Sequence, residues 1–334
     1  MRMKYTLPLI LSLTALFAAA CAKTDTTSPN ADEKAFLEAW LPLHYPDAVK
    51  SGKGIYIVED LPGDGPVWDS EKPYTQVDYI IRNLSNTVSA STTEAMARQL
   101  GTYNSLHFYG PRYVSTGKDL SYAGVDEILK GMRAGGTRTA IIPAWMMSYE
   151  RYDTEEEYLA ESSSAGTSIY TITFYGQTED VIRDQYQELK AYATRLWQVA
   201  DTLESGIFFR SFQNADQESV AKDTTVYINY TGRLLNGKVF DTTIADTAKV
   251  HHIYTAGKSY APIAVSMAPE VANIKMGGSA PVTGFQKGLF LLHAHEKASF
   301  AFSSVYGYGA SGKNPVLPGY APLHFDVELV DKPQ

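Results

Sequence analysis

The sequence has 334 residues, of which 44% are hydrophobic, 12% aromatic and 20% charged. Its length suggests two or three domains, and its composition excludes a disordered or collagen-like chain. The formal net charge is −8, from 29 Lys and Arg against 37 Asp and Glu, and an acidic chain without a basic run is a poor candidate for binding nucleic acid.

The first 20 residues have the features of a secretory signal peptide. Arg2 and Lys4 form a basic start, an apolar run follows over residues 5–20, and three alanines stand directly before Cys21. The apolar run is too short for a comfortable transmembrane helix, which needs about 20 residues. Small residues ahead of a cysteine resemble the bacterial lipobox, in which the cysteine is lipidated and becomes the mature N-terminus.

Cys21 is the single cysteine of the chain, which excludes a disulfide framework and a metal site made of cysteines. Its position favours a lipid anchor over the alternative, an ordinary cleavage site with an incidental cysteine. Residues 21–30 are expected to form a flexible stalk, because residues 22–30 are small and polar. The implied location is the cell envelope, where the lipid holds the protein to a membrane, facing the periplasm or as an outer-membrane lipoprotein.

Two later stretches, residues 31–43 and 178–203, are predicted to be helical. In the second stretch Thr178 can cap the helix, Glu179 lies at its positive end, and Gly206 follows its last turn. Apolar residues recur along this stretch at spacings of mostly three and four, which predicts one apolar face. Each helix is followed by a serine–glycine pair and a strand-like run.

The order of segments after each helix is the same. Residues 77–82 match 228–233 at an offset of 151, and residues 124–129 match 284–289 at an offset of 160. A period of about 150 residues indicates a domain duplication, because solenoid repeats are about 20–50 residues long. Short helices and long loops separate the strands, so each copy is predicted to be α+β with an antiparallel sheet.

Four separate blocks in the second copy form a recognisable pattern. They are YTGRLLNGKVFD at 230–241, GFQKGL at 284–289, YGYGASG at 306–312 ahead of LP at 317–318, and LHFDVEL at 323–329. In order, spacing and identity these blocks resemble the FK506-binding-protein (FKBP) class of peptidyl-prolyl cis-trans isomerases, over about residues 220–332. The resemblance implies two FKBP-like domains, each a curved antiparallel β-sheet wrapped on a short helix, joined by a connector helix.

The predicted organisation after the stalk has three parts. Residues 31–177 form a degenerate FKBP-like domain, residues 178–205 the connector helix, and residues 206–334 the FKBP-type isomerase domain. The first copy is predicted to be degenerate because Ser89 and Ala90 stand where the second copy has Phe240 and Asp241. It is expected to hold substrate or pack against the second copy. The acidic segment at 150–161 is read as a solvated loop in preference to an interaction site.

The chemistry of proline isomerisation suits an aromatic cavity. Amide resonance sets a barrier of about 18–20 kcal/mol, so a catalyst needs no nucleophile and no metal but a site that favours the twisted amide. Apolar walls exclude water from the planar amide, and a few hydrogen bonds hold the twisted carbonyl. By resemblance, the site comprises eight residues: Tyr230, Phe240, Asp241, Val282, Phe285, Tyr308, Leu317 and Phe325.

The resemblance also implies roles for the polar groups of this site. Asp241 accepts a hydrogen bond from a neighbouring hydroxyl or faces the rotating carbonyl, while the Tyr308 hydroxyl and the Val282 backbone N–H donate to substrate. No cofactor is expected. The implied ligands are proline-containing segments of exported proteins and macrolides of the FK506 type. The alternative is that the aromatic residues are ordinary core residues, but the carboxylate directly after Phe240 favours a pocket.

Three features depart from the family pattern. Phe285 stands where the family normally has a tryptophan at the floor of the pocket, which implies a changed affinity for proline. LHAHE replaces the usual Met-x-x-Gly-Glu at 292–296, which affects a turn. Residues 243–279 form an insertion, expected to be a flap over the pocket or a second binding surface, and the loop 313–316 is expected to set substrate preference.

These observations predict a lipid-anchored, extracytoplasmic peptidyl-prolyl isomerase that assists the folding of exported proteins. The alternatives are a non-catalytic FKBP-like chaperone or assembly lipoprotein, and a structural envelope protein. The pair Phe240 and Asp241 favours the enzyme. The substitution at Phe285 and the loss of site residues from the first copy favour the chaperone.

Overall fold

The computed structural model describes residues 30–118, 120–161, 165–198, 206–213 and 219–333. The predicted signal peptide, Cys21 and all but the last residue of the predicted stalk lie outside these residues. Within the described ranges, no helix combines the length and apolar character needed to cross a bilayer.

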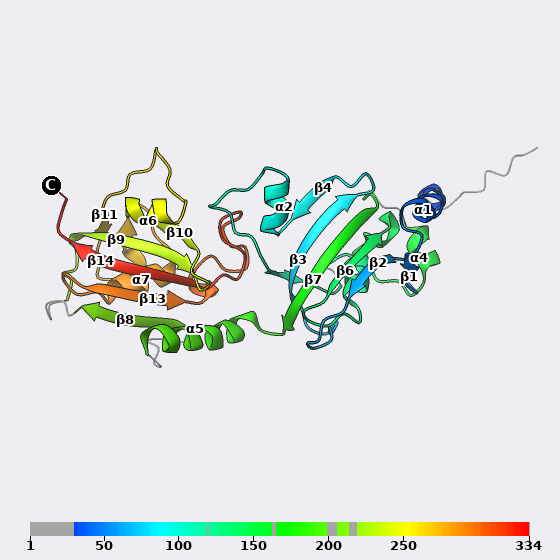
Figure 1. Ribbon diagram of the computed structural model, residues 1–334. Helices are drawn as coiled ribbons and strands as arrows, with labels where there is room; N and C mark the ends of the chain where they lie inside the picture. Colours follow the sequence, from blue (N-terminus) through cyan, green and yellow to red (C-terminus); the bar gives the residue numbers. More distant parts are fainter. Residues whose placement is uncertain (1–29, 119, 162–164, 199–205, 214–218, 334) are drawn as a thin grey trace, which may run out of the picture.

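Two antiparallel sheets of seven strands each form the two ends of the molecule (Figure 1). The strands of the first sheet are β1 (Val49–Lys50), β2 (Tyr56–Leu61), β3 (Tyr74–Asn83), β4 (Val88–Ser91), β5 (Arg112–Ser115), β6 (Thr137–Ile142) and β7 (Ser168–Thr178). They pair in the order β1-β2-β6-β7-β3-β4, and β5 also pairs with β3.

The second sheet repeats this arrangement. Its strands are β8 (Ile207–Gln213), β9 (Thr225–Leu234), β10 (Val239–Thr242), β11 (Ile263–Ser266), β12 (Lys275–Met276), β13 (Lys297–Phe302) and β14 (Leu323–Val330). They pair in the order β12-β11-β9-β14-β13-β8, and β10 also pairs with β9. The predicted α+β class with two antiparallel sheets is therefore confirmed.

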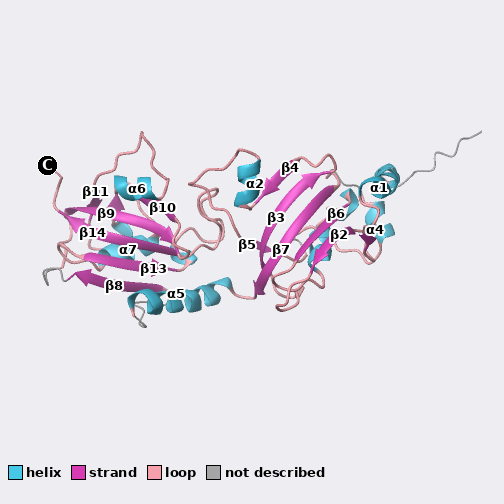
Figure 2. Cartoon of the chain, viewed as in Figure 1, coloured by secondary structure: helices cyan, strands magenta, loops and turns pink. Residues whose placement is uncertain are grey.

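The helices are mostly short and lie beside the sheets (Figure 2). The α-helices are α1 (Ala31–His44), α2 (Glu94–Gln99), α3 (Ala123–Leu129), α4 (Glu155–Ala160), α5 (Val181–Trp197), α6 (Ala245–Val250) and α7 (Thr283–Phe290). Single 3₁₀ turns cover Ala144–Met146, Val271–Asn273 and Ser304–Tyr306.

The two copies correspond element by element. Strand β3 begins at Tyr74 and β9 at Thr225, 151 residues later, and the same offset relates β4 to β10, α2 to α6 and β5 to β11. One cross-strand contact recurs as well: the Tyr79 N–H donates to Thr92 Oγ1 at 2.9 Å, as the Tyr230 N–H does to Thr243 Oγ1 at 2.9 Å. The segment 243–279, predicted to be an insertion, thus has a counterpart in the first copy.

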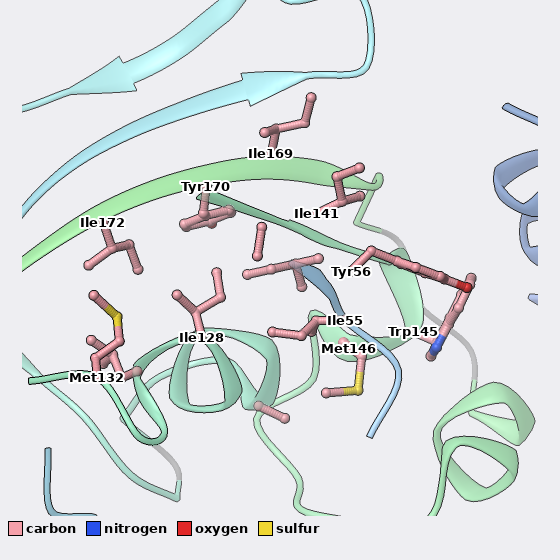
Figure 3. Close-up of a cluster of buried hydrophobic side chains, with 14 of the residues drawn as sticks. Ile55, Tyr56, Ile128, Met132, Ile141, Trp145, Met146, Ile169, Tyr170 and Ile172 are labelled. Carbon is pink, nitrogen blue, oxygen red and sulfur yellow. The ribbon is translucent and has the colours of Figure 1, made fainter. Parts of the chain in front are cut away.

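The first core fills the space between its sheet and α3. Ile128 of α3 lies below Tyr170 and Ile172 of β7, and Ile55 and Ile141 complete the centre of this cluster (Figure 3). All five side chains are at most 9% exposed. The second core has the same plan, with Phe285 and Leu289 of α7 packed against the inner face of β13 and β14.

The connector helix is shorter than predicted and begins with a different cap. Thr178 is the last residue of β7, and the Asp180 carboxylate accepts hydrogen bonds from the N–H groups of Ile182 and Arg183 at 2.9 and 3.0 Å. The carboxylate is one of the strongest N-cap groups, and here it lies two residues past the strand end. The helix ends at Trp197, because Gln198 adopts a left-handed conformation (φ 57°), so Gly206 is not its terminator.

Side chains of α5 fix the connector to the second sheet. Leu189, Tyr192 and Trp197 are buried against Phe208 and Ala301. The Tyr192 hydroxyl lies 2.7 Å from Nδ1 of His324, a residue of β14 that is only 4% exposed. The predicted apolar face therefore covers the second sheet only in part: Leu189 and Tyr192 lie on the buried face, whereas Leu196 is 50% exposed. Its last predicted members, Val199 and Leu203, lie outside the described residues.

Behind this contact lies a small polar network. His324 Nε2 lies 3.0 Å from Asp326 Oδ1, and Asp326 also accepts hydrogen bonds from Ser299 and Arg233. Burial by itself raises the pKa of Asp326, but the hydrogen bonds from His324 and Ser299 and the attraction of His324 and Arg233 outweigh it and lower the pKa to about 2.

We predict that this network stabilises the second domain except in acid. A lowered folded-state pKa contributes stability above the unfolded value of about 3.8–3.9, and this stability is lost as the pH falls toward about 2. Because the carboxylate is partly exposed to solvent, Asp326→Asn should lower the free energy of unfolding by about 1 kcal/mol at pH 7. Urea unfolding followed by tryptophan fluorescence would measure this difference, which should shrink between pH 5 and pH 2.

Asp331→Asn, at a carboxylate that is 94% exposed, serves as the control and should change the free energy of unfolding little. A constant difference down to pH 2 would contradict the assignment.

Candidate functional site

Strand β9 brings three of the predicted site residues together. It lies between β10 and β14, and Gly232 of β9 pairs with Asp241 on one side and with Phe325 on the other. Phe240 precedes Asp241 on β10. The strand register therefore makes neighbours of Phe240 and Phe325, which are 85 positions apart in the sequence. The antiparallel pairing therefore places the aromatic rings and the carboxylate at one region of the sheet.

Gly232 is the position where two rings meet the backbone. A Cβ atom at Gly232 would lie 2.7 Å from Phe240 Cζ and 2.7 Å from Phe325 Cε1, closer than atoms of side chains approach. The two rings are perpendicular, with centroids 5.7 Å apart. The glycine thus permits an edge-to-face pair that any larger residue would disrupt.

An aromatic cluster lies behind this pair. Phe285, the third residue of α7, is 2% exposed, and its ring centroid lies 4.7 Å from that of Phe325 and 5.7 Å from that of Tyr230. The interplanar angles are 72° and 70°, so both contacts are edge-to-face. The phenylalanine that replaces the family's tryptophan is therefore fully packed.

Asp241 is held by two partners. The Tyr230 hydroxyl donates a hydrogen bond to Asp241 Oδ2 at 2.7 Å, and the Lys258 ammonium forms an ion pair with Oδ1. Burial, followed by the charge of Asp241, raises the pKa of Tyr230, so its hydroxyl remains a donor at neutral pH. The expected hydroxyl partner of Asp241 is thus Tyr230, and Lys258 is a partner that the sequence did not indicate.

A cavity of about 250 Å³ opens beside Asp241. It is a little smaller than typical small-molecule sites of about 300–1,000 Å³, which suits one ring or side chain. The residues that line it come from five segments of the chain: Leu106, Phe240, Asp241, Ile253, Thr255, Lys258, Tyr308, Lys313, Val316 and Leu317.

Four of the eight predicted site residues line this cavity. These are Phe240, Asp241, Tyr308 and Leu317, whereas the rings of Tyr230, Phe285 and Phe325 form the cluster behind them. Val282 is not among the lining residues. It precedes α7, its carbonyl accepts from the Phe285 and Gln286 N–H groups, and its own N–H donates to no residue that the structure describes.

The remaining lining residues come from segments that the sequence predicted only coarsely, or not at all. Ile253, Thr255 and Lys258 belong to the segment 243–279, expected to be a flap or a second surface, and Lys313 belongs to the loop expected at the mouth. Leu106 belongs to the first copy. No local signal could have placed Leu106 here, because only the packing of one domain on the other brings it to the cavity.

The equivalent region of the first copy has different chemistry. Ser89 and Ala90 occupy on β4 the places of Phe240 and Asp241 on β10, and they line a cavity of about 310 Å³. In the register of β3 with β7, Ile81 pairs with Tyr170, the position of Gly232 and Phe325. The aromatic pair and the acid are both replaced, so this cavity lacks the groups that define the site in the second copy.

A larger cavity, of about 450 Å³, lies between the two domains. Its lining includes Phe108, Arg112, Glu188 and Tyr320, but neither Asp241 nor Tyr308. Burial raises the pKa of Glu188. The cavity with the held carboxylate, although smaller, is the one that carries recognisable chemistry, and we therefore assign the site to it.

Comparison with known proteins identifies this architecture. Residues 216–330 match the family model described as FKBP-type peptidyl-prolyl cis-trans isomerase. FK506-binding protein 1A of Aspergillus fumigatus is 30% identical over 109 residues, which are 33% of this chain and 78% of that protein. FK506-binding protein 1 of Rhizopus delemar is 29% identical over 126 residues, 37% of this chain and 96% of that protein.

Bacterial proteins match as well. A probable FKBP-type peptidyl-prolyl cis-trans isomerase of Haemophilus influenzae is 25% identical over 130 residues, covering 39% of this chain and 44% of that protein. The crystal structure of FkpA from Escherichia coli aligns with a TM-score of 0.32 at 21% identity, over 45% of this chain and 58% of that one. The chain belongs to the FKBP-type peptidyl-prolyl cis-trans isomerase family, and its second domain is an isomerase domain of this type.

We predict that Gly232→Ala destabilises the second domain. The new methyl group would force the Phe240 and Phe325 rings apart, and overpacking of this kind costs about 1–3 kcal/mol. Urea unfolding of the full chain would measure the loss. Gly257→Ala is the matched control, because a Cβ there meets no atom within 4 Å. Equal stability of the two variants would show that the rings move aside freely.

Proposed function

We propose that the second domain isomerises X–Pro peptide bonds in the cavity beside Asp241, and that its substrates are proline-containing segments of exported proteins. The observation that carries this proposal is a carboxylate held by Tyr230 and Lys258 at the wall of a cavity that Phe240, Val316 and Leu317 also line. A packed core does not need a half-exposed acid in this position, whereas a site that acts on an amide does.

Desolvation supplies one part of the proposed mechanism. Resonance makes the planar amide polar and well hydrated, and the twisted amide loses this resonance. Walls formed by Phe240, Val316 and Leu317 exclude water from the bound amide. They disfavour the planar ground state more than the twisted transition state, and only such a difference accelerates a reaction.

Fixed polar groups supply the second part. The Asp241 carboxylate faces the carbonyl carbon of the rotating bond, and its two partners hold it in place, so it need not reorganise as the amide turns. Burial, with a smaller contribution from the charge of Asp241, raises the pKa of Tyr308. Tyr308 therefore stays protonated and donates its hydroxyl to the substrate backbone.

We predict that Phe240→Ala with Asp241→Ala strongly lowers the isomerase activity of the full chain. Loss of the apolar wall and of the carboxylate should lower kcat/KM by about 100-fold. This decrease corresponds to about 2.8 kcal/mol of transition-state stabilisation, at about 1.4 kcal/mol for each factor of ten. Proline-limited refolding and a peptide isomerisation assay would measure the change. Ser89→Ala, at the position in the first copy that corresponds to Phe240, is the matched control and should retain full activity.

The same variants separate the enzyme from a non-catalytic chaperone. A wild-type chain that suppresses aggregation without accelerating isomerisation would refute catalysis and favour the chaperone. Residual activity of the double variant close to that of wild type would move catalysis to another site, including the cavity of the first copy.

We further propose that a lipid on Cys21 holds the protein in the cell envelope. The support is the basic start, the apolar run and the small residues directly before the single cysteine. A diacylglyceryl group together with a further acyl chain gives stable membrane attachment without a transmembrane helix.

Cys21→Ser is expected to release the protein from membranes. Expression of residues 1–334 in a bacterial host, followed by fractionation and mass spectrometry, should find wild type in the membrane fraction with a lipidated N-terminal cysteine. Ser28→Ala, in the stalk, should leave the anchor intact. An unmodified mature chain that begins at another residue would contradict the proposal.

A further inference from the structure

The isomerase cavity contains one side chain from the other domain. Leu106 lies in a loop of the first copy, residues 102–110, which we call the bridging loop. This leucine lines the cavity together with Phe240, Asp241 and Ile253. It also packs on the small apolar cluster of Val239, Ala248 and Ile253 in the second domain. The bridging loop follows α2 and meets the second domain between the two sheets (Figure 1).

Three hydrogen bonds hold the bridging loop against the second domain. The Phe108 N–H donates to the Pro315 carbonyl at 2.8 Å, the Lys238 ammonium donates to the Ser105 carbonyl at 2.7 Å, and the Ser105 hydroxyl donates to the His252 carbonyl. These contacts lie on both sides of Leu106 in the sequence. The position of the leucine side chain is thus fixed by the backbone before and after it.

Contacts within the bridging loop shape it independently of the second domain. The Tyr103 and Tyr109 rings stack with centroids 5.6 Å apart, and the Tyr109 hydroxyl accepts a hydrogen bond from the Asn104 N–H at 3.0 Å. The side chain of Asn104 accepts from the Leu106 N–H at 2.9 Å. A loop ordered by its own side chains can present a leucine at low entropic cost.

The second domain has the same loop 151 residues later. Tyr254 and Tyr260 stack at 5.0 Å, and the Tyr260 hydroxyl accepts from the Thr255 N–H at 2.9 Å. This equivalent loop supplies Ile253, Thr255 and Lys258 to the cavity. Both copies of one duplicated loop therefore line a single cavity, which is built from two domains.

The geometry points to Leu106 as a specificity-determining residue, and this inference rests on the proposed isomerase function of the same cavity. Asp241 faces the carbonyl of the residue X that precedes proline, so the side chain of X lies against the part of the wall next to Asp241. Leu106 and Ile253 make this part apolar, while Lys258 and Lys313 place two cations at the cavity. We propose that Leu106, supplied by the first domain, favours substrates with an apolar residue before proline, while the lysines of the second domain disfavour a basic one.

The test compares four peptides that differ only at X, with X as Leu, Ala, Glu or Lys. For the full-length wild type we expect kcat/KM to fall from Leu to Ala and to be lowest for Lys. Leu106→Ala should lower the ratio of kcat/KM for the peptide with X as Leu to that for the peptide with X as Ala about fivefold. Leu100→Ala, at an exposed leucine of the same domain outside this cavity, is the matched control and should preserve the wild-type ratio.

A pair of charged variants distinguishes direct contact from a merely structural role. Leu106→Lys should raise the ratio of kcat/KM for the peptide with X as Glu to that for the peptide with X as Lys, and Leu106→Glu should lower this ratio. We expect each change to be about tenfold relative to wild type and smaller at high salt. Since each ratio is measured on one protein sample, partial unfolding of a variant lowers both activities and cancels from the ratio.

The outcomes separate the inference from the proposed function. Wild-type activity with unchanged ratios in all three Leu106 variants would overturn the role of Leu106 alone. A uniform rise in activity for every peptide after Leu106→Ala would make the bridging loop an inhibitory lid, and would also overturn it. Absence of wild-type isomerase activity would overturn the proposed function itself.

Discussion

The close approach of two aromatic rings to the backbone at Gly232 determines the shape of the candidate site. Phe240 and Phe325 come from strands on either side of β9, and they can meet edge to face only because no Cβ lies between them. Their contact turns one side of Phe240 toward the cavity and seats Phe325 on Phe285. The carboxylate of Asp241 follows directly in the sequence, so the same register that packs the rings also places the acid.

The polar part of the site depends on this packing in turn. Tyr230 is buried in the aromatic cluster, and burial keeps its hydroxyl protonated as a donor to Asp241. Lys258 reaches Asp241 from a loop outside the sheet. An acid held by one buried and one exposed partner keeps one orientation. A fixed orientation is needed if the acid is to interact with a carbonyl that changes its orientation during the reaction.

The two domains share one framework but differ in the residues at the site. Both domains keep the strand order and a threonine hydroxyl that accepts a hydrogen bond from a backbone N–H of β3 or β9. Both also keep a loop in which two tyrosine rings stack on each other. In the first copy Ser89, Ala90 and Ile81 replace the residues that form the ring pair and the acid. What the first copy retains is the loop, and this loop now reaches the neighbouring domain's cavity. The first domain can lack the ring pair and the acid and still supply Leu106 to the cavity of the second domain. This is because the contacts that shape the bridging loop do not involve Ser89, Ala90 or Ile81.

Local sequence patterns predicted much of the fold. The offsets of 151 and 160 residues were found from short matching segments, and the strands from local alternation; the structure contains both. The predicted ends of the connector helix were wrong. Thr178 and Gly206 are both favourable terminal residues, but strand pairing extends through Thr178, and the left-handed conformation of Gln198 ends the helix earlier. Pairing with a distant strand outweighs a local capping preference, which is worth only about 1 kcal/mol.

The sequence by itself determined the duplication, the family of the second domain and the identity of the eight candidate site residues, because each of these is carried by motifs of a few adjacent residues. Only the tertiary structure decided which of the eight line the cavity and which lie behind it. It also decided that Lys258 pairs with Asp241 and that Leu106 completes the wall. These contacts join residues from separate loops and from separate domains. Their positions are set by the packing of the two duplicated units, which no local pattern encodes.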